Sequence, residues 1–475
     1  MIFSSSLFLV YFLPIFLLVY CFVDKSHKNN VILLASIVFY AWGEPTFIFI
    51  LLLSTIIDFY LVKRLHQASE NNIKKRWLLL SLTMNLGLLA YFKYANFFIE
   101  NVNSVLTSAG VENVAWTNVL LPIGISFYTF QTLTYSIDVY RKVSNPLDNL
   151  RDYLVYILSF PQMIAGPIVR FNLIADQIVN RIETVDDRLQ GFFRFSIGLA
   201  KKVLIANAMG EQADLIMNQA AGDISTPTAW IGILAYTFQI YFDFAGYSDM
   251  AIGLGRMMGF TFPENFKSPY TSQSISEFWR RWHITLGDWM RDYLYIPLGG
   301  NRVGSKARLY FNLWFVFLIS GLWHGASWNF VIWGAFHGLF LILDRLFLLK
   351  TLNKIGKIPA VIFTFFIVII GWVFFRLEKF SDAIAYLSRM FAFDNFDDKV
   401  ILEKQFLTVF CIAVFFSFFT LTKWGKRWEI RTYEMPTVLS TKQSSYLVGV
   451  SLLLFIVCLS YIAAAGFNPF IYFRF

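Results

Sequence analysis

The chain alternates between long apolar runs and short polar linkers over its 475 residues. Most runs have about the 20 residues that a helix needs to cross a hydrocarbon layer about 30 Å thick. The pattern therefore predicts an all-α polytopic membrane protein, with residues 1–475 forming a single membrane-embedded domain. The apolar runs lie at 7–23, 30–41, 46–62, 77–94, 118–135, 191–209, 228–254, 359–376, 403–422 and 445–465.

Two further apolar stretches do not fit simple crossings. Residues 153–169 contain two prolines and a glycine, which interrupt helical hydrogen bonding, so we expect a broken, re-entrant segment surrounded by protein. Residues 310–344 begin and end beside arginines, which indicates a hairpin that returns to its starting side. Its first half would rise about 20 Å and place the turn 323–325 deep in the bilayer.

The distribution of Lys and Arg predicts the orientation of the chain. Linkers 95–117 and 210–227 contain neither residue type, and segment 377–402 is acidic on balance, with Asp394, Asp397 and Asp398. Because basic loops stay in the cytoplasm, these segments and both termini are expected outside it. The basic linkers are 63–76, 136–152, 170–190, 255–309, 345–358 and 423–444.

Composition supports the membrane prediction and argues against a soluble protein or a nucleic-acid-binding protein. The chain is 57% hydrophobic and 15% charged, against about 25% charged residues in a typical soluble protein. The net charge of +9 follows from basic cytoplasmic loops and does not require nucleic acid as a partner. The three cysteines lie far apart in apolar runs, so we expect no metal site and no disulfide framework.

His324 is the candidate catalytic residue that stands out from the pattern. It occupies the expected turn of the 310–344 hairpin, next to Gly325, where a substrate can approach the backbone closely. A neutral imidazole can take a proton from a hydroxyl group near neutral pH. The alternative is a buried histidine that only packs helices together, which is the reading we favour for His337.

Residues 276–295 carry a second cluster of candidate residues. Aromatic side chains recur there at helical spacing between charged ones, which predicts an amphipathic helix in the membrane interface that includes His283. The basic side chains either face solvent on the cytoplasmic side or bind the phosphates of a donor. Those basic residues are Arg280, Arg281 and Arg291, followed by Arg302, Lys306 and Arg308.

The run 228–254 carries a polar face along an otherwise apolar helix. Gly246 and Gly253 lie on this face with Asp243, so it should point into the bundle. Asp249 lies six residues after Asp243 and falls on another face. The two carboxylates could carry protons, orient a histidine, or pair with arginine at a helix end.

Several runs of the sequence resemble the membrane-bound O-acyltransferase family, most closely its bacterial alginate O-acetyltransferase branch. The resemblance covers nearly the whole chain and is most specific in the third and fifth runs. The runs are SFPQMIAGPIVR (159–170), YFDFAGYSDMAIGLGRMMGF (241–260), NFKSPYTSQSISEFWRRWHITL (265–286), YIPLGGNR (295–302), SGLWHGASWNFVIWGAFHG (320–338), GWVFFR (371–376) and FIYFRF (470–475).

This resemblance implies more than the pattern shows. It implies about 10–12 transmembrane helices with re-entrant segments, a central funnel and a core motif region at about 153–345. The family's membrane histidine corresponds to His324, and its second histidine to His283. Members of the branch hold no bound cofactor and take acetyl from cytoplasmic acetyl-CoA. They pass it across the bacterial inner membrane to a periplasmic SGNH-type acetyltransferase partner, which O-acetylates an exported polysaccharide such as alginate or peptidoglycan.

Other functions remain open on the sequence alone. A related branch transfers D-alanine to teichoic acids. A glycan-precursor transporter or flippase would also suit the intramembrane carboxylates and the broken segment, although no inverted repeat is apparent. A structural scaffold would tolerate the loss of His324.

Overall fold

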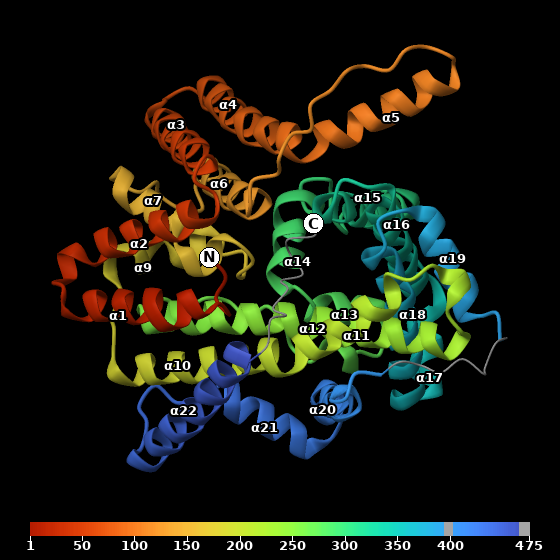
Figure 1. The fold of residues 1–475 in the computed structure, drawn as a ribbon. Helices are drawn as coiled ribbons and strands as arrows, with labels where there is room; N and C mark the ends of the chain where they lie inside the picture. Colours follow the sequence, from red (N-terminus) through yellow and green to blue (C-terminus); the bar gives the residue numbers. More distant parts are fainter. Residues whose placement is uncertain (394–401, 465–475) are drawn as a thin grey trace. The chain divides into compact units, whose positions relative to one another are not determined.

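The computed structural model describes residues 1–393 and 402–464, and all regular elements in these ranges are helices (Figure 1). This confirms the all-α fold class. The acidic residues Asp394, Asp397 and Asp398 and the ending 470–475 lie outside the described residues. The chain forms two compact units, residues 1–184 with 258–262, and residues 185–257 with 263–475.

The first unit is a set of helices, several of which match the apolar runs, whereas the helices Ala95–Ser108 and Phe171–Asn180 form in predicted linkers. A buried carboxylate, Asp58, joins three of them by accepting hydrogen bonds from Asn85 Nδ2 at 2.9 Å and Tyr153 Oη at 2.6 Å. Such a fully bonded polar group fixes how neighbouring helices pack. The helices are α1 (Leu13–Phe22), α2 (Lys28–Gly43), α3 (Phe47–Gln67), α4 (Asn71–Leu89), α5 (Ala95–Ser108), α6 (Ile125–Tyr140), α7 (Leu150–Leu158), α8 (Phe160–Met163) and α9 (Phe171–Asn180).

The stretch 153–169 is broken, as its prolines predict. Helix α7 ends at Leu158, and the short α8 begins at Phe160 with Pro161 in its first turn. All residues from 152 to 169 are buried. The expectation that protein surrounds this irregular backbone is therefore confirmed, whereas its depth in a membrane stays a prediction.

The second unit contains all candidate site residues. Its first helices are α10 (Val185–Ala200), the π-helical η4 (Lys201–Ala206), α11 (Asn207–Met217) and α12 (Thr226–Met257). The central helices are α13 (Ile275–Arg281), α14 (Ile284–Met290), η7 (Arg291–Tyr295), α15 (Lys306–His324), α16 (Trp328–Leu343) and η8 (Asp344–Leu348). The last are α17 (Leu349–Ile355), α18 (Lys357–Arg376), α19 (Phe380–Met390), α20 (Phe406–Phe418), α21 (Lys423–Tyr433) and α22 (Thr441–Ala464).

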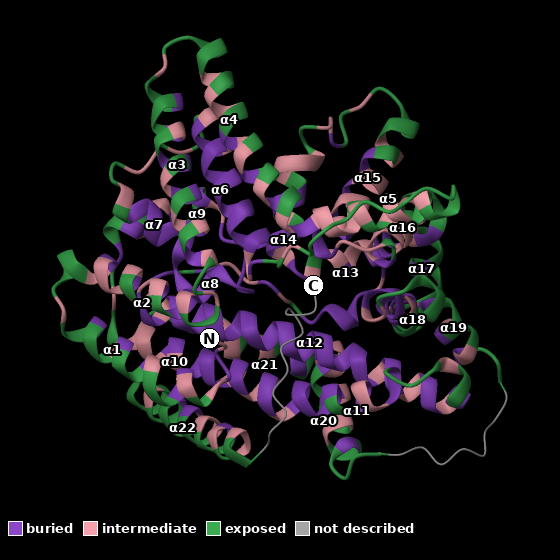
Figure 2. Ribbon diagram, turned by 45° about the horizontal axis from the view of Figure 1, so that its top comes forward, coloured by how far each residue is buried: buried purple, intermediate pink, exposed green. Residues whose placement is uncertain are grey.

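Helix α12 is buried along nearly its whole length and packs against α10 through glycines (Figure 2). A Cβ added to Gly198 would lie 2.5 Å from the carbonyl oxygen of Gly246, and one added to Gly246 would lie 2.7 Å from that of Gly198. Gly191 and Gly253 meet in the same way one heptad away. The small face predicted for α12 therefore points into the bundle, where it permits close helix contact.

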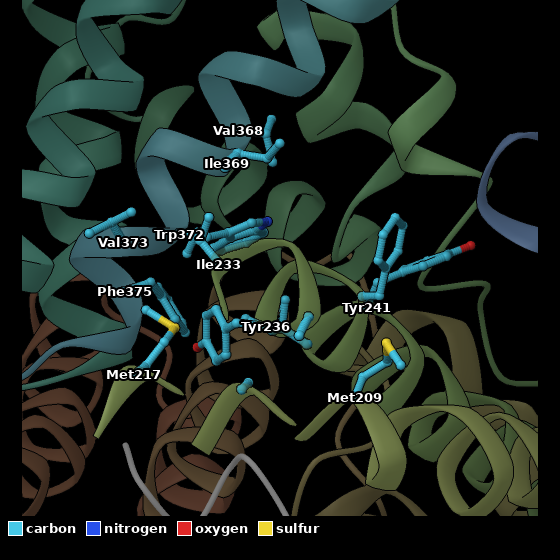
Figure 3. Packing of buried hydrophobic residues seen from close by; sticks show 14 of the residues in the cluster. Met209, Met217, Ile233, Tyr236, Tyr241, Val368, Ile369, Trp372, Val373 and Phe375 are labelled. Atoms are coloured by element: carbon cyan, nitrogen blue, oxygen red, sulfur yellow. The ribbon is translucent and has the colours of Figure 1, made fainter. Parts of the chain in front are cut away.

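Aromatic and branched side chains fill the core of the second unit. Trp372 and Phe375 of α18 lie over Tyr236 of α12, with Met217 of α11 beside them (Figure 3). Trp372 and Trp333 are almost completely buried and stack with ring centroids 6.3 Å apart. This core holds α16 and α18 against α12 and therefore supports the site described below.

Four helical stretches among the described residues are long and apolar enough to cross a membrane: Asn71–Ser108, Trp328–Ile355, Lys357–Arg376 and Thr441–Ala464. A fifth candidate is the pair α20 and α21, which is bent by 98°. Helices such as α12 miss this test because polar residues on their buried faces lower the mean hydropathy. Membrane character is thus confirmed, while 10–12 crossings and a central funnel stay predictions.

The prediction of one amphipathic interfacial helix over 276–295 is wrong. The chain breaks into α13, α14 and η7, and His283 between the first two adopts φ +47°. Phe278, Trp282 and Trp289 are buried, so they do not lie at a surface. Tertiary packing decides here: the bridge between Trp282 and Phe266 holds the segment against a loop that the helical pattern does not reveal.

Candidate active site

The predicted hairpin at 310–344 is confirmed. Helix α15 ends at His324, the chain turns through 325–327, and α16 runs back from Trp328. Glycines permit this close pairing, because a Cβ on Gly321 would collide with the carbonyl oxygen of Phe330, and one on Gly334 with that of Phe317. His324 is therefore held at the end of a tightly packed pair of helices.

We predict that Gly321→Ala destabilises the protein by about 1–3 kcal/mol, the usual cost of overpacking. The matched control is Gly304→Ala, because nothing lies within 4 Å of a Cβ there. Thermal unfolding in detergent would show a lower Tm for the first variant alone. Equal Tm values for both variants would refute the close contact.

His324 lies in an aromatic pocket, with 6% of its surface exposed. Its ring centroid lies 4.9 Å from that of Trp323, 5.1 Å from Trp333 and 5.2 Å from Phe375, all in edge-on arrangements. These rings restrict how the imidazole can turn and exclude water around it. Such a setting suits a histidine that must meet a substrate in one orientation.

His283 is the residue at which α13 and α14 separate. Its left-handed backbone is uncommon for a residue with a side chain, and such strain often marks functional positions. The side chain is 1% exposed, and its Nδ1 lies 3.0 Å from Asn265 Oδ1. The backbone N–H of Thr285 also donates to Asn265 Oδ1, which identifies that atom as the oxygen.

The hydrogen bond to Asn265 determines the tautomer of His283. An amide oxygen only accepts, so Nδ1 carries the hydrogen and Nε2 keeps its lone pair. Nε2 is buried and has no hydrogen-bond partner among the described residues. Burial lowers the pKa of His283, which lies outside the candidate membrane-spanning helices, to about 3. The ring is therefore neutral near pH 7, with an available basic nitrogen.

The structure brings the two candidate histidines together. The ring centroids of His283 and His324 lie 6.4 Å apart, and the His283 ring lies 6.0 Å from that of Trp323. The sequence suggested two separate places, a deep turn for His324 and a membrane surface for His283. The break in the predicted interfacial helix is what allows His283 to reach the hairpin.

A cavity of about 480 Å³ opens beside His283 in the second unit. Three arginines line it: Arg280 of α13, Arg291 of η7 and Arg345 of η8. All three are exposed, whereas His283 lies buried at the cavity wall. Tyr295 and Asp288 contribute further polar groups. The cavity thus joins a basic surface to His283, whose ring lies 6.4 Å from that of His324.

The other basic residues predicted for this role, Arg281, Arg302, Lys306 and Arg308, do not line the cavity. Arg281 donates to Thr271 Oγ1 at 3.0 Å and pairs with Glu277 at 2.5 Å, so it braces α13. Arg302 is an exposed loop residue outside the cavity lining. Within the lining, a hydrogen bond from Arg291 to Asp292, together with Asp288, raises the pKa of Arg291 above its usual value. Arg280 and Arg345 make no ion pair with any described residue.

The two carboxylates of α12 pair with cations. Asp243 lies 3.0 Å from Lys202 Nζ, and both side chains are buried. Asp249 lies 2.6 Å from both Arg194 and Lys201. Of the three roles considered for these carboxylates, pairing is the one that the structure supports.

His337 packs within the helix bundle. Its ring contacts those of Trp279 and Trp333, each with centroids 5.1 Å away. Its Nε2 lies close to Gly371 of α18. This agrees with the helix-packing role that we favour. No group of three metal-ligating side chains occurs among residues 1–393 and 402–464.

Sequence comparison identifies the family. Residues 36–377 match the membrane-bound O-acyltransferase family. The chain belongs to this family. It is an O-acyltransferase, and the transporter and scaffold alternatives are therefore set aside.

Three relatives share most of their length with this O-acyltransferase. A probable alginate O-acetylase of Pseudomonas putida is 42% identical over 492 residues, covering 100% of both chains. Another from Pseudomonas aeruginosa is 46% identical over 397 residues, 83% of this chain and 75% of the relative. A peptidoglycan O-acetyltransferase of Helicobacter pylori is 37% identical over 425 residues, 82% of this chain and 80% of the relative.

Sequence reasoning missed two residues of the site. Asn265 is needed to orient His283, but nothing in its local pattern distinguishes it from a loop asparagine. Arg345 was used only as a marker of the cytoplasmic side, although it lines the same cavity as Arg280. Its position at the end of the hairpin, one helix length from His324, was the signal that was available.

Proposed function

We propose that this enzyme takes an acetyl group from cytoplasmic acetyl-CoA and moves it across the inner membrane for O-acetylation of an exported polysaccharide. The observation that supports this most is the cavity, which leads from three arginines to buried His283, beside His324. A polyanionic thioester fits such a basic entrance, because guanidinium groups bind phosphates in bidentate geometry. The names of the alginate and peptidoglycan relatives support the acetyl group and the glycan class.

In this proposal, the arginines hold the donor and the histidines assist the transfer. Arg280, Arg291 and Arg345 bind the phosphates of acetyl-CoA, which directs the thioester toward His283. The acceptor hydroxyl attacks the thioester carbon, a C–O bond forms and the C–S bond breaks. His324 takes the hydroxyl proton, and the coenzyme leaves as a thiolate that regains a proton. Nε2 of His283 accepts a hydrogen bond from a protonated group of the thioester donor or of the hydroxyl acceptor.

The acceptor is proposed to be a periplasmic SGNH-type acetyltransferase partner, whose hydroxyl group carries acetyl onward to the glycan. The three arginines of the donor cavity support this division, because basic residues are expected on the cytoplasmic side. In this proposal the acceptor reaches His324 from the periplasmic side.

The donor proposal is tested by removing cavity charges singly. We expect Arg280→Gln and Arg345→Gln each to raise KM for acetyl-CoA about 5- to 100-fold with a smaller change in kcat, because each loses a charge-assisted hydrogen bond. Arg302→Gln is the control, since it removes the same charge outside the cavity. Steady-state transfer from labelled acetyl-CoA would measure both constants. An equal effect of all three variants would mean that Arg280 and Arg345 contribute only general surface charge and do not bind the donor.

The proposed orientation places both termini and linkers 95–117 and 210–227 in the periplasm. In a protein lacking Cys21, Cys411 and Cys458, cysteines at exposed Ser108 and Gln219 should react with an impermeant maleimide in intact cells. A cysteine at exposed Ser305 should react only after permeabilisation. Protection of Gln219→Cys alone would contradict this topology.

A further inference from the structure

A second cavity, of about 710 Å³, lies in the second unit apart from the histidines. Helices α10 and α12 form one wall, and α20, α21 and α22 form the other. None of its lining residues belongs to the cavity beside His283. Acetyl transfer as proposed above makes no use of this space.

The greater part of this cavity is apolar. Ile197 and Leu204 of the α10–η4 helix face Phe416 of α20, with Leu447 and Leu454 of α22. Helix α22 is itself a candidate membrane span, and 17% of its apolar stretch is buried within the protein. A ligand that lies between α22 and α10 is therefore next to the hydrocarbon layer, where acyl chains are the available apolar groups.

One end of the cavity is polar, and Tyr433 of α21 contacts the charged residues there. Tyr433 accepts a hydrogen bond from Lys201 Nζ at 3.0 Å, and Arg194 lies over its ring at 4.1 Å. Asp249 pairs with both cations and, with Glu264 on Arg194, neutralises them. These contacts hold the polar end of the cavity in place. The third basic residue of the lining, Arg431, takes no part in them.

Helix α21 has the composition of a membrane-interface helix. It is bent by 98° from α20, and Trp424 and Trp428 stack at 5.4 Å on it. Tryptophan and basic residues are typical of the headgroup level. The helix carries four basic side chains and one acidic one, Lys423, Lys426, Arg427 and Arg431 against Glu429. Arg431 lines the cavity and forms no ion pair with any described residue.

We propose that this cavity binds one anionic glycerophospholipid from the leaflet in which α21 lies. An acyl chain occupies the space between α10 and α22, and the phosphate lies at Arg431. The apolar depth, the adjoining membrane span and Arg431 match the two ends of such a lipid. Glu429 also lines the cavity, where it accepts a hydrogen bond from Ser268 Oγ at 2.6 Å. The occupied site holds α21 and α22 against α10 and stabilises the C-terminal helices of the enzyme.

Native mass spectrometry of the full-length protein in detergent tests the proposal with phosphatidylglycerol and phosphatidylcholine as probes. We expect one retained phosphatidylglycerol, bound more tightly than phosphatidylcholine. Val450→Trp fills the apolar part and should weaken binding about tenfold or more, because the site is a pocket of limited volume. Gly449→Trp is the matched control, since Gly449 precedes Val450 and nothing lies within 4 Å of a Cβ added there.

A second pair of variants tests the headgroup end. Arg431→Gln should remove most of the preference for phosphatidylglycerol, whereas Arg427→Gln, outside the lining, should keep it. If Val450→Trp is not folded, Ala200→Phe fills the same cavity from the facing helix. Equal retention by Val450→Trp and Gly449→Trp, absence of preference between the two lipids, or displacement of the lipid by acetyl-CoA would each overturn the proposal.

Discussion

Replacing His324 by asparagine is expected to abolish acetyl transfer while the protein still inserts and folds. Positioned proton transfer contributes about 10²–10⁴-fold to rate, and asparagine cannot accept a proton at neutral pH. The aromatic pocket of Trp323, Trp333 and Phe375 also excludes the water that could replace the imidazole. Transfer from labelled acetyl-CoA in membranes, with protein level checked by immunoblot, would measure the loss.

His337→Asn is the matched control for this experiment. His337 is also buried in an aromatic setting, but it packs against α18 at Gly371, and its ring contacts among the described residues do not include the His283 ring. We expect this variant to lose stability, with the activity per folded molecule largely kept. Near-normal transfer by a well-inserted His324→Asn protein would remove the central element of the proposed mechanism.

The positions of the membrane-crossing helices could be predicted because a helix surrounded by lipid must be apolar over its length. Lipid requires about 20 apolar residues for each crossing, so α18 and α22 stand out in the sequence. The glycines of α12 also predicted which face of that helix packs inside the bundle. Gly246 and Gly253 share a helical face, and the structure uses that face for contact with α10. The turn at His324 followed from the charges at both ends of the hairpin.

The details of the site could not be predicted because they depend on contacts between distant segments. The helical pattern of 276–295 hides the break at His283, since the left-handed backbone there is stabilised by Asn265 from a preceding loop. Among the basic residues, only packing separates Arg280, which lines the cavity, from its neighbour Arg281, which binds Glu277. A basic cluster in sequence gives the charge but does not show which side chains share a space.

Asn265→Asp is expected to make acetyl transfer sensitive to acid. The asparagine oxygen accepts a hydrogen bond from His283 Nδ1, and burial keeps the pKa of His283 at about 3. A carboxylate at the same place favours the imidazolium form and would raise that pKa by about 1–3 pH units. Because the neutral ring is the active form, activity is lost as pH falls through the raised pKa. An acidic limb should therefore move into the measurable range of kcat/KM.

Two further variants separate this effect from a change in packing. Asn265→Leu leaves His283 without its orienting acceptor, so we expect at least about tenfold lower kcat at every pH, from loss of the correct tautomer. Thr285→Val removes another hydrogen bond to the same oxygen, from Thr285 Oγ1 at 3.0 Å, but leaves the imidazole contact intact. Its pH profile should match that of the unmodified protein. An Asn265→Asp enzyme whose kcat/KM follows the same pH profile as Thr285→Val would show that His283 takes no part in the reaction, and that Asn265 serves only to join the loop to α14.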